Sequence, residues 1–177
     1  MKQIQIKPKK VMRVGETIEL VCHNITHLLA ENDNIVRLLA SSSPECLSLD
    51  VTEEMRDEIF DEGDRAKSRV FQTPFVPKTE TKSCAQLRVY ASQVNPLTEF
   101  TADVYIVIDI IVDVEVNALL KGQRWFRLMS EIIDTISGKD VGGISRLQLY
   151  KSVISLINYK DNFFGYCLPF QVKVGAD

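Results

Sequence analysis

Two histidines and a glutamate recur at four-residue spacing near the start of the chain. Glu19, His23 and His27 would share one face of a helix, and zinc accepts side chains of these types as ligands. A single helix presents three ligands poorly to a tetrahedral ion, and no other cysteine or carboxylate is obliged to complete the set. A metal-dependent enzyme is therefore only a minor alternative, and we interpret both histidines as residues of a polar helix face.

Other residues that could support catalysis form no recognisable group. The four cysteines make no Cys-x-x-Cys pair, and Gly142-Gly143 belongs to no phosphate-binding motif. No Gly-x-Ser-x-Gly elbow occurs, and two histidines on one helix supply general acid–base chemistry poorly. We therefore predict that the chain is not an enzyme and has no catalytic residues, no bound metal and no cofactor.

Acidic side chains recur along one face of the most apolar segment. Asp109 and Asp113 would lie about 13 Å apart at a strand rise of ~3.3 Å per residue. This distance exceeds the limit of roughly 9.5 Å for paired glycosidase carboxylates. With Asp103 and Glu115 they form an acidic stripe. It could face basic side chains of a neighbouring subunit, line a negative lumen, or face solvent and deter wrong strand pairing.

The element that positions these acids is a strand expected over residues 101–114. Its even-numbered residues from Val104 to Val114 are all aliphatic, whereas the odd-numbered residues are mixed. Such a strand lies inside a sheet, and we expect one subunit to cover its second face only partly. A helix with an apolar stripe is expected to follow over 117–138 and to end at Gly138.

The remaining elements alternate between helical and strand patterns. Helices are expected over 17–31, with Thr17 as N-cap, and over 35–40. Between them, Asn32, Asp33 and Asn34 break or re-cap the helix. Strand patterns cover 87–92, before a turn at Asn95-Pro96, and then 144–149, 153–158 and 164–174. Short turns between strands imply an antiparallel sheet with helices packed on one face, an α+β fold.

The segment 44–83 is the least regular part of the chain. Its acidic portion, 52–62, could form one or two helical turns capped by Thr52, and a proline-containing stretch follows over 73–82. We expect a long surface loop, and loops of this length tend to be functional or to order only on assembly.

Size and composition restrict the class of protein. The 177 residues fit a single domain, divided into an N-terminal helical part (1–43), the long loop (44–83) and a strand–strand–helix–strands core (84–177). The net charge of −3 argues against a dedicated nucleic-acid surface. The apolar run 104–116 is shorter than the ~20 residues that a membrane-spanning helix needs, so no membrane contact is expected. Four widely spaced cysteines indicate reduced thiols in a protein made in the cytosol.

The C-terminal half resembles the neck proteins of tailed bacteriophages, of the tail-terminator and head–tail connector types. The resemblance covers about residues 70–177. It rests on the acidic central strand running into a helix, the Lys121-Gly122-Gln123-Arg124 step, and a Gly-Gly turn leading to strands that start at Phe164-Gly165-Tyr166. The stretch Val70-Phe71-Gln72-Thr73-Pro74-Phe75 is also of the type seen in that family.

This resemblance implies a structural virion protein, most similar to a tail terminator that caps the tail and joins it to the head. Its expected partners are its own copies in a ring, taken as hexameric, neighbouring neck, tail-tube or connector proteins, and DNA passing through the channel. The protein would be made in the host cytoplasm and located in the virion. A head-side connector and a non-viral adaptor module remain alternatives. The residues assigned to a subunit interface or the lumen are Asp109, Asp113, Glu115, Arg124 and Arg127.

Overall fold

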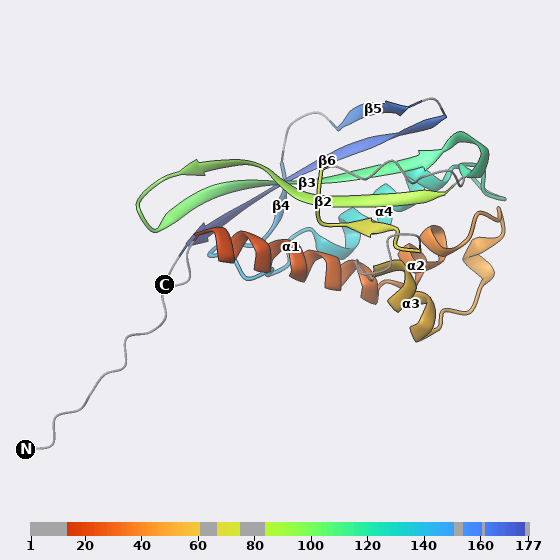
Figure 1. The fold of residues 1–177 in the computed structure, drawn as a ribbon, viewed down its shortest axis with the longest axis horizontal. Coiled ribbons are helices and arrows are strands. Elements are labelled where there is room, and N and C mark those ends of the chain that lie inside the picture. Colours follow the sequence, from red (N-terminus) through yellow and green to blue (C-terminus); the bar gives the residue numbers. More distant parts are fainter. Residues whose placement is uncertain (1–13, 61–66, 75–83, 151–153, 161, 176–177) are drawn as a thin grey trace, which may run out of the picture.

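In the computed structural model, a layer of helices packs on one face of a twisted sheet (Figure 1). The structure describes residues 14–60, 67–74, 84–150, 154–160 and 162–175. The described helices are α1 (Val14–Glu31), α2 (Asp33–Ala40), α3 (Glu53–Phe60) and α4 (Arg124–Ile136), with 3-10 turns at Cys46–Ser48 and Val114–Val116. The described strands are β1 (Val70–Phe71), β2 (Ala85–Pro96), β3 (Thr101–Asp113), β4 (Gln148–Leu149), β5 (Ser155–Lys160) and β6 (Phe163–Gly175). The predicted α+β class, with helices on one face, is confirmed.

The sheet is built around the long antiparallel strands β2, β3 and β6. Its strand order is β1-β2-β3-β6-β4, and β5 pairs with the other half of β6. Only the two-residue strand β1 runs parallel to its neighbour among the described pairs, so the sheet is mostly antiparallel, as predicted. Strands β2 and β3 form a hairpin whose turn projects past the helical layer at the left of Figure 1.

Strand β3 buries both of its faces over most of its length. The aliphatic face, from Val104 to Val112, is fully buried beneath α1 and α4. On the opposite face Val107 and Ile111 are buried as well. The expectation that one subunit covers this second face only partly is therefore wrong for the C-terminal half of the strand. The second face is only partly covered at the start of β3, where Asp103 and Tyr105 are half-buried.

Gly165 allows β6 to lie close against β3. A Cβ atom at this position would sit 1.6 Å from the carbonyl oxygen of Ile110. No side chain can occupy that space, so glycine at position 165 is a packing requirement of this strand pair.

Two predicted boundaries in the N-terminal and central parts are wrong. Helix α1 begins at Val14, and Thr17 is a buried residue inside it, not its N-cap. Strand β2 continues through Asn95 and Pro96, and the turn is formed by residues 97–100. Proline is tolerated here because it ends a strand at the edge of the sheet, where its missing N–H interrupts no ladder.

Helix α4 starts at Arg124, seven residues later than predicted. A 3-10 turn first ends β3, and a bridge between Ala118 and Gln123 then closes a loop. Gly122 has a φ of 96° in this loop, which favours glycine. The strand predicted over 144–149 is also shorter than expected, since only Gln148–Leu149 pairs with β6.

The described parts of segment 44–83 contribute to the core. Cys46, Ile59, Val70 and Phe71 are buried, so residues 44–60 and 67–74 are not simply a surface loop. The backbone N–H of Met55 donates to the Thr52 hydroxyl at 3.2 Å, which confirms the predicted cap of α3. The rest of the predicted loop, 61–66 and 75–83, lies outside the described residues. No helix within the described ranges is both long and apolar enough to cross a membrane.

Candidate functional site

The three carboxylates assigned to an interface or lumen lie in different environments. Asp109 is 7% exposed and Asp113 is 5% exposed, so both are buried by the chain itself. Asp113 accepts a hydrogen bond of 2.8 Å from the backbone N–H of Glu115, which fixes the 3-10 turn after β3. Only Glu115 is exposed. The predicted acidic stripe therefore does not reach the surface at Asp109 and Asp113.

Asp109 belongs to a polar cluster on the sheet face opposite the helices. Arg88 and Cys167 are its register neighbours on β2 and β6, and the Tyr90 hydroxyl donates to Asp109 Oδ2 at 3.0 Å. Burial raises the pKa of Asp109, although hydrogen bonds from Tyr90 and Cys167 and the charge of Arg88 oppose the shift. Burial raises the pKa of Cys167 to about 11, and the negative charge of Asp109 is a smaller cause in the same direction. A thiol with a raised pKa is a poorer nucleophile at neutral pH, because less of it is present as thiolate.

The side chain of Arg124 is fully buried and does not reach the surface. Its guanidinium donates to the carbonyl oxygens of Val116 (2.7 Å), Leu38 (2.6 Å) and Ser43 (3.0 Å) and to Cys46 Sγ (3.4 Å). Burial lowers the pKa of Arg124. The side chain thereby joins α4 to the end of α2 and to the following turn. It has no surface to offer a neighbouring subunit.

Arg127, one turn further along α4, lies on the surface. Its side chain is 49% exposed and pairs with Glu131 at 2.9 Å. Of the five predicted residues, Glu115 and Arg127 are therefore the two that lie on the surface, and the structure does not bring the five together as one site.

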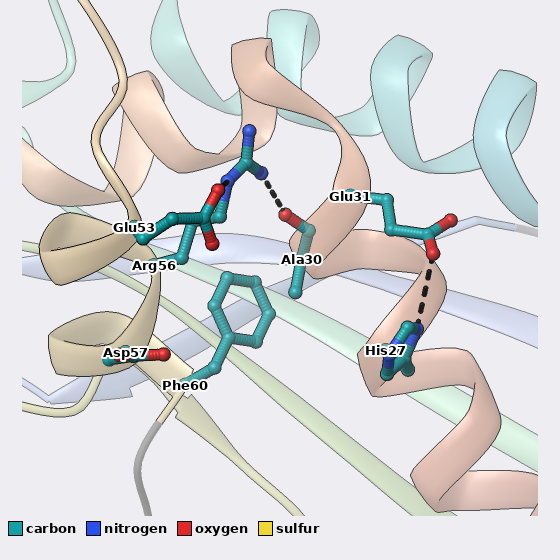
Figure 2. Close-up of a pocket in the computed structure, with 7 residues that line it drawn as sticks. All are labelled: His27, Ala30, Glu31, Glu53, Arg56, Asp57 and Phe60. Carbon is teal, nitrogen blue, oxygen red and sulfur yellow. Dashed lines mark hydrogen bonds and ion pairs between the residues drawn. The ribbon is translucent and has the colours of Figure 1, made fainter.

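A cavity of about 740 Å³ lies between the end of α1 and α3 (Figure 2). Its lining residues are His27, Ala30, Glu31, Glu53, Arg56, Asp57 and Phe60. Figure 2 shows Arg56 reaching from α3 towards the carbonyl of Ala30, while His27 and Glu31 face each other along α1. His27 Nδ1 lies 3.4 Å from Glu31, and Arg56 Nε lies 3.5 Å from Glu53.

The lining of this cavity combines a histidine, an arginine and three carboxylates with Ala30 and Phe60. The seven described lining residues include no serine, threonine, cysteine or lysine nucleophile, and Glu53 forms an ion pair with Arg56. Glu19 and His23 are exposed on α1, and within the described ranges no three histidine, cysteine or acidic side chains group closely enough to hold a metal ion. The cavity can accommodate a ligand, but its residues assign no reaction to it.

A second pocket, of about 460 Å³, lies between two loops at the far end of β3. Its lining comes from residues 44–48 and 119–121: Pro44, Glu45, Leu47, Ser48, Leu119, Leu120 and Lys121. Leu120 is 72% exposed, the largest exposure among the large apolar side chains of the described residues. At the opposite end of the strand, the β2–β3 turn exposes Leu97 and Phe100 by 49% and 57%.

Neither surface was predicted from the sequence. The one available signal was the presence of large apolar residues in turns, at Leu97, Phe100 and Leu120, where polar residues are more usual. The pocket itself has no sequence signal because its two loops are about 75 residues apart and meet only in the folded chain.

Residues 32–172 of the chain match the family model YomW. The chain belongs to the YomW family. The name is that of a phage-derived domain of the SPbeta prophage type, which agrees with the phage origin implied by the resemblance in sequence. The family name does not specify a neck or tail-terminator protein. A search of curated proteins found no match to this YomW-family protein.

Proposed function

We propose that this YomW-family protein is a non-catalytic structural subunit of the phage neck, most similar to a tail terminator that caps the tail and joins it to the head. The observation that carries the proposal is the exposure of large apolar side chains at both ends of the molecule. Large apolar side chains that are exposed next to one another mark interaction surfaces. Leu97 and Phe100 lie at one end, and Leu47 and Leu120 lie at the other.

The chemistry of the buried polar groups supports a structural role over a catalytic one. Asp109 and Arg124 are held by neighbours that fix strands and helices, and Cys167 is kept protonated. The same side chains in an active site would face a cavity that substrate can enter. Neither cavity contains any of these three residues.

Two different apolar ends favour a ring over a simple dimer. A two-fold dimer uses the same patch on both subunits, whereas unlike patches at opposite ends give a head-to-tail contact. Head-to-tail contacts close into a ring when the rotation between subunits allows it. The net charge of −3 suits a ring through which DNA passes without being held, because tight DNA binding depends on basic side chains that displace counterions.

The oligomeric state of the purified protein tests this proposal. We expect sedimentation velocity from low micromolar to near-millimolar concentration to show assembly, and negative-stain images of the concentrated protein to show closed rings of one subunit number, with six as the expected value. A protein that stays monomeric throughout this range would contradict the proposal and would favour a free-standing adaptor module.

The position of the ring in the particle requires a separate experiment. Rings mixed with isolated tails are expected to bind the tail end and to block further tube growth. Binding to heads alone would instead assign the protein as a head-side connector, which is the neighbouring alternative within the same neck.

A further inference from the structure

Charge is distributed very unevenly along the chain. Residues 1–13 contain five basic side chains and no acidic one: Lys2, Lys7, Lys9, Lys10 and Arg13. Residues 14–60 contain ten acidic side chains and two arginines, whereas residues 61–177 contain fourteen of each sign and have no net charge. A basic segment is therefore joined directly to a strongly acidic helical part.

Part of this acidic surplus lines the cavity between α1 and α3, called the acidic groove below. Glu31 of α1 and Glu53 and Asp57 of α3 line it, and all three are exposed. Only His27 lies beside the carboxylate of Glu31, at 3.4 Å, and the side chain of Asp57 has no ion-pair partner among the described residues. The groove thus presents carboxylates that are open to a cation.

The arginine in the groove does not neutralise these carboxylates. Arg56 pairs with Asp33 and with Glu53, and it also donates to the carbonyl of Ala30 (Figure 2). Its charge is therefore balanced by two other acids, and Glu31 and Asp57 keep theirs.

Charges around the groove do not reverse its sign. Helices α1 and α3, the residues joined to them through ion pairs, and Arg69 next to α3 supply eight carboxylates and four basic side chains. The carboxylates are Glu16, Glu19, Glu31, Asp33, Glu53, Glu54, Asp57 and Glu58, and the basic side chains are Arg37, Arg56, Lys67 and Arg69. Segment 139–146 and Lys173, which pack beside α1, add three basic side chains and one acidic one, so the surface stays acidic.

The groove also offers apolar surface to a long basic side chain. Its volume is about 740 Å³, and Ala30 and Phe60 contribute to its lining. Lysine can lay its methylene stem along such surface while its ammonium group meets a carboxylate. An aromatic ring such as that of Phe60 attracts the same cation.

The basic segment is long enough to reach the groove of its own chain. From Val14 to Glu31, helix α1 spans about 26 Å at ~1.5 Å per residue. Thirteen extended residues cover up to roughly 43 Å, so the segment can turn back along α1. A short tether gives a local concentration of millimolar order, which favours the chain's own groove over a neighbour's at micromolar protein.

We propose that residues 1–13 bind in the acidic groove of their own chain. Lysines of the segment meet Glu31 and Asp57, and their stems lie against Phe60. The bound segment closes the groove to other basic peptides, which must displace it to enter. This inference goes beyond the proposed function and does not depend on it, because the contact forms within one subunit.

Zero-length cross-linking of the full chain tests the contact directly. A carbodiimide joins a lysine amine to a carboxylate that it touches. We expect mass spectrometry to find lysines of residues 1–13 linked to Glu31, Glu53 or Asp57. The yield should fall at least fivefold in 1 M salt, where the Debye length is about 3 Å. No such links, or equal yields at acidic residues outside the groove, would overturn the proposal.

An equal mixture of ¹⁴N- and ¹⁵N-labelled chains shows whose groove is filled. Binding within a chain gives linked peptide pairs of a single isotope, whereas binding between chains gives mixed pairs as about half of the product. Mixed pairs in that proportion would overturn the assignment to the chain's own groove. Monomers and rings give the same answer, so a failure here leaves the proposed ring untouched, and a monomeric wild type leaves this contact untouched.

Peptide competition gives an independent measurement. A fluorescent peptide with the sequence of residues 1–13 should bind the full-length variant Lys2→Gln/Lys7→Gln/Lys9→Gln/Lys10→Gln at least tenfold more tightly than wild type, because its groove is empty. Adding Glu31→Lys/Asp57→Lys should weaken this binding at least tenfold. Glu99→Lys/Asp134→Lys makes the same charge change at exposed residues outside the groove and is the matched control, expected to change the affinity less than twofold.

All substituted side chains described by the structure are exposed, so these variants should fold, as circular dichroism will verify. Equal peptide affinity for wild type and the lysine variant would overturn the proposal, and so would equal effects of the groove substitutions and their control. A segment that forms no link to the groove but raises the affinity of the protein for duplex DNA would be a nucleic-acid contact instead.

Discussion

Arg124 and Arg127 stand three residues apart in α4 and have opposite environments. Arg124 is fully buried and donates to three backbone carbonyls, whereas Arg127 is half exposed. Arg124→Met should lower the free energy of unfolding by roughly 3–5 kcal/mol, because buried carbonyls lose their donors. Arg127→Met, the matched control, should change it by less than about 1 kcal/mol, since exposed ion pairs contribute little. Urea unfolding measures both, and equal losses would contradict the role assigned to Arg124.

The raised pKa of Asp109 predicts a pH dependence of stability. The folded protein binds the proton of this carboxyl more tightly than the unfolded chain, whose aspartates titrate at about 3.9. Stability is therefore greatest below that value and falls as the pH rises from about 4 through the folded-state pKa. Asp109→Asn removes the titration and can still accept from Tyr90. We expect the stability of this variant relative to wild type to increase with pH across that window, as measured by urea unfolding at several pH values. A constant difference would show that the carboxyl titrates normally.

At the scale of elements, Asn32 joins three helices. Its Oδ1 accepts from the N–H groups of Asn34 (2.9 Å) and Ile35 (3.2 Å) and so caps α2 directly after α1. Its Nδ2 donates to Glu131 (3.2 Å) and Thr135 (2.8 Å) on α4. The amide of Asn32 thus has two tasks: its oxygen accepts hydrogen bonds that cap α2, and its nitrogen donates hydrogen bonds to α4.

Asn32→Asp separates the two tasks, because aspartate caps helices as well as asparagine does but cannot donate. We expect it to destabilise the protein by about 1–2 kcal/mol, since its carboxylate faces Glu131. Adding Glu131→Gln should recover most of that loss in thermal unfolding. If Asn32→Asp is as stable as wild type, the bonds to α4 contribute nothing and Asn32 acts only as a cap.

At the scale of the whole molecule, a single core predicts a single unfolding event. Buried residues of all four described helices and of strands β1, β2, β3 and β6 belong to one continuous apolar cluster. We expect far-UV circular dichroism and the fluorescence of Trp125, the one tryptophan of the chain, to report the same midpoint in urea. Two separate transitions would instead divide the N-terminal helices from the sheet as a second domain.

The class of the fold and its central elements could be inferred from the order of the residues alone. The alternation along β3, the helical stripe of α4, the cap of α3 by Thr52 and the break at Asn32 were readable because each depends on residues close in the chain. Element boundaries were read less well. The start of α4 depends on a loop bridged from Ala118 to Gln123, and the length of β2 depends on pairing with β3.

The burial of polar side chains and the position of the exposed apolar surfaces depend on how distant parts of the chain meet in the fold. Asp109 and Arg124 looked like interface residues in the sequence, but Asp109 is buried against Tyr90, and Arg124 meets Leu38, 86 residues away. The β2–β3 turn and the pocket between residues 44–48 and 119–121 likewise acquire their opposite positions from the length of β3 and the meeting of two distant loops. Local patterns specify helices and strands, whereas burial and pockets depend on contacts between distant residues that periodicity does not encode.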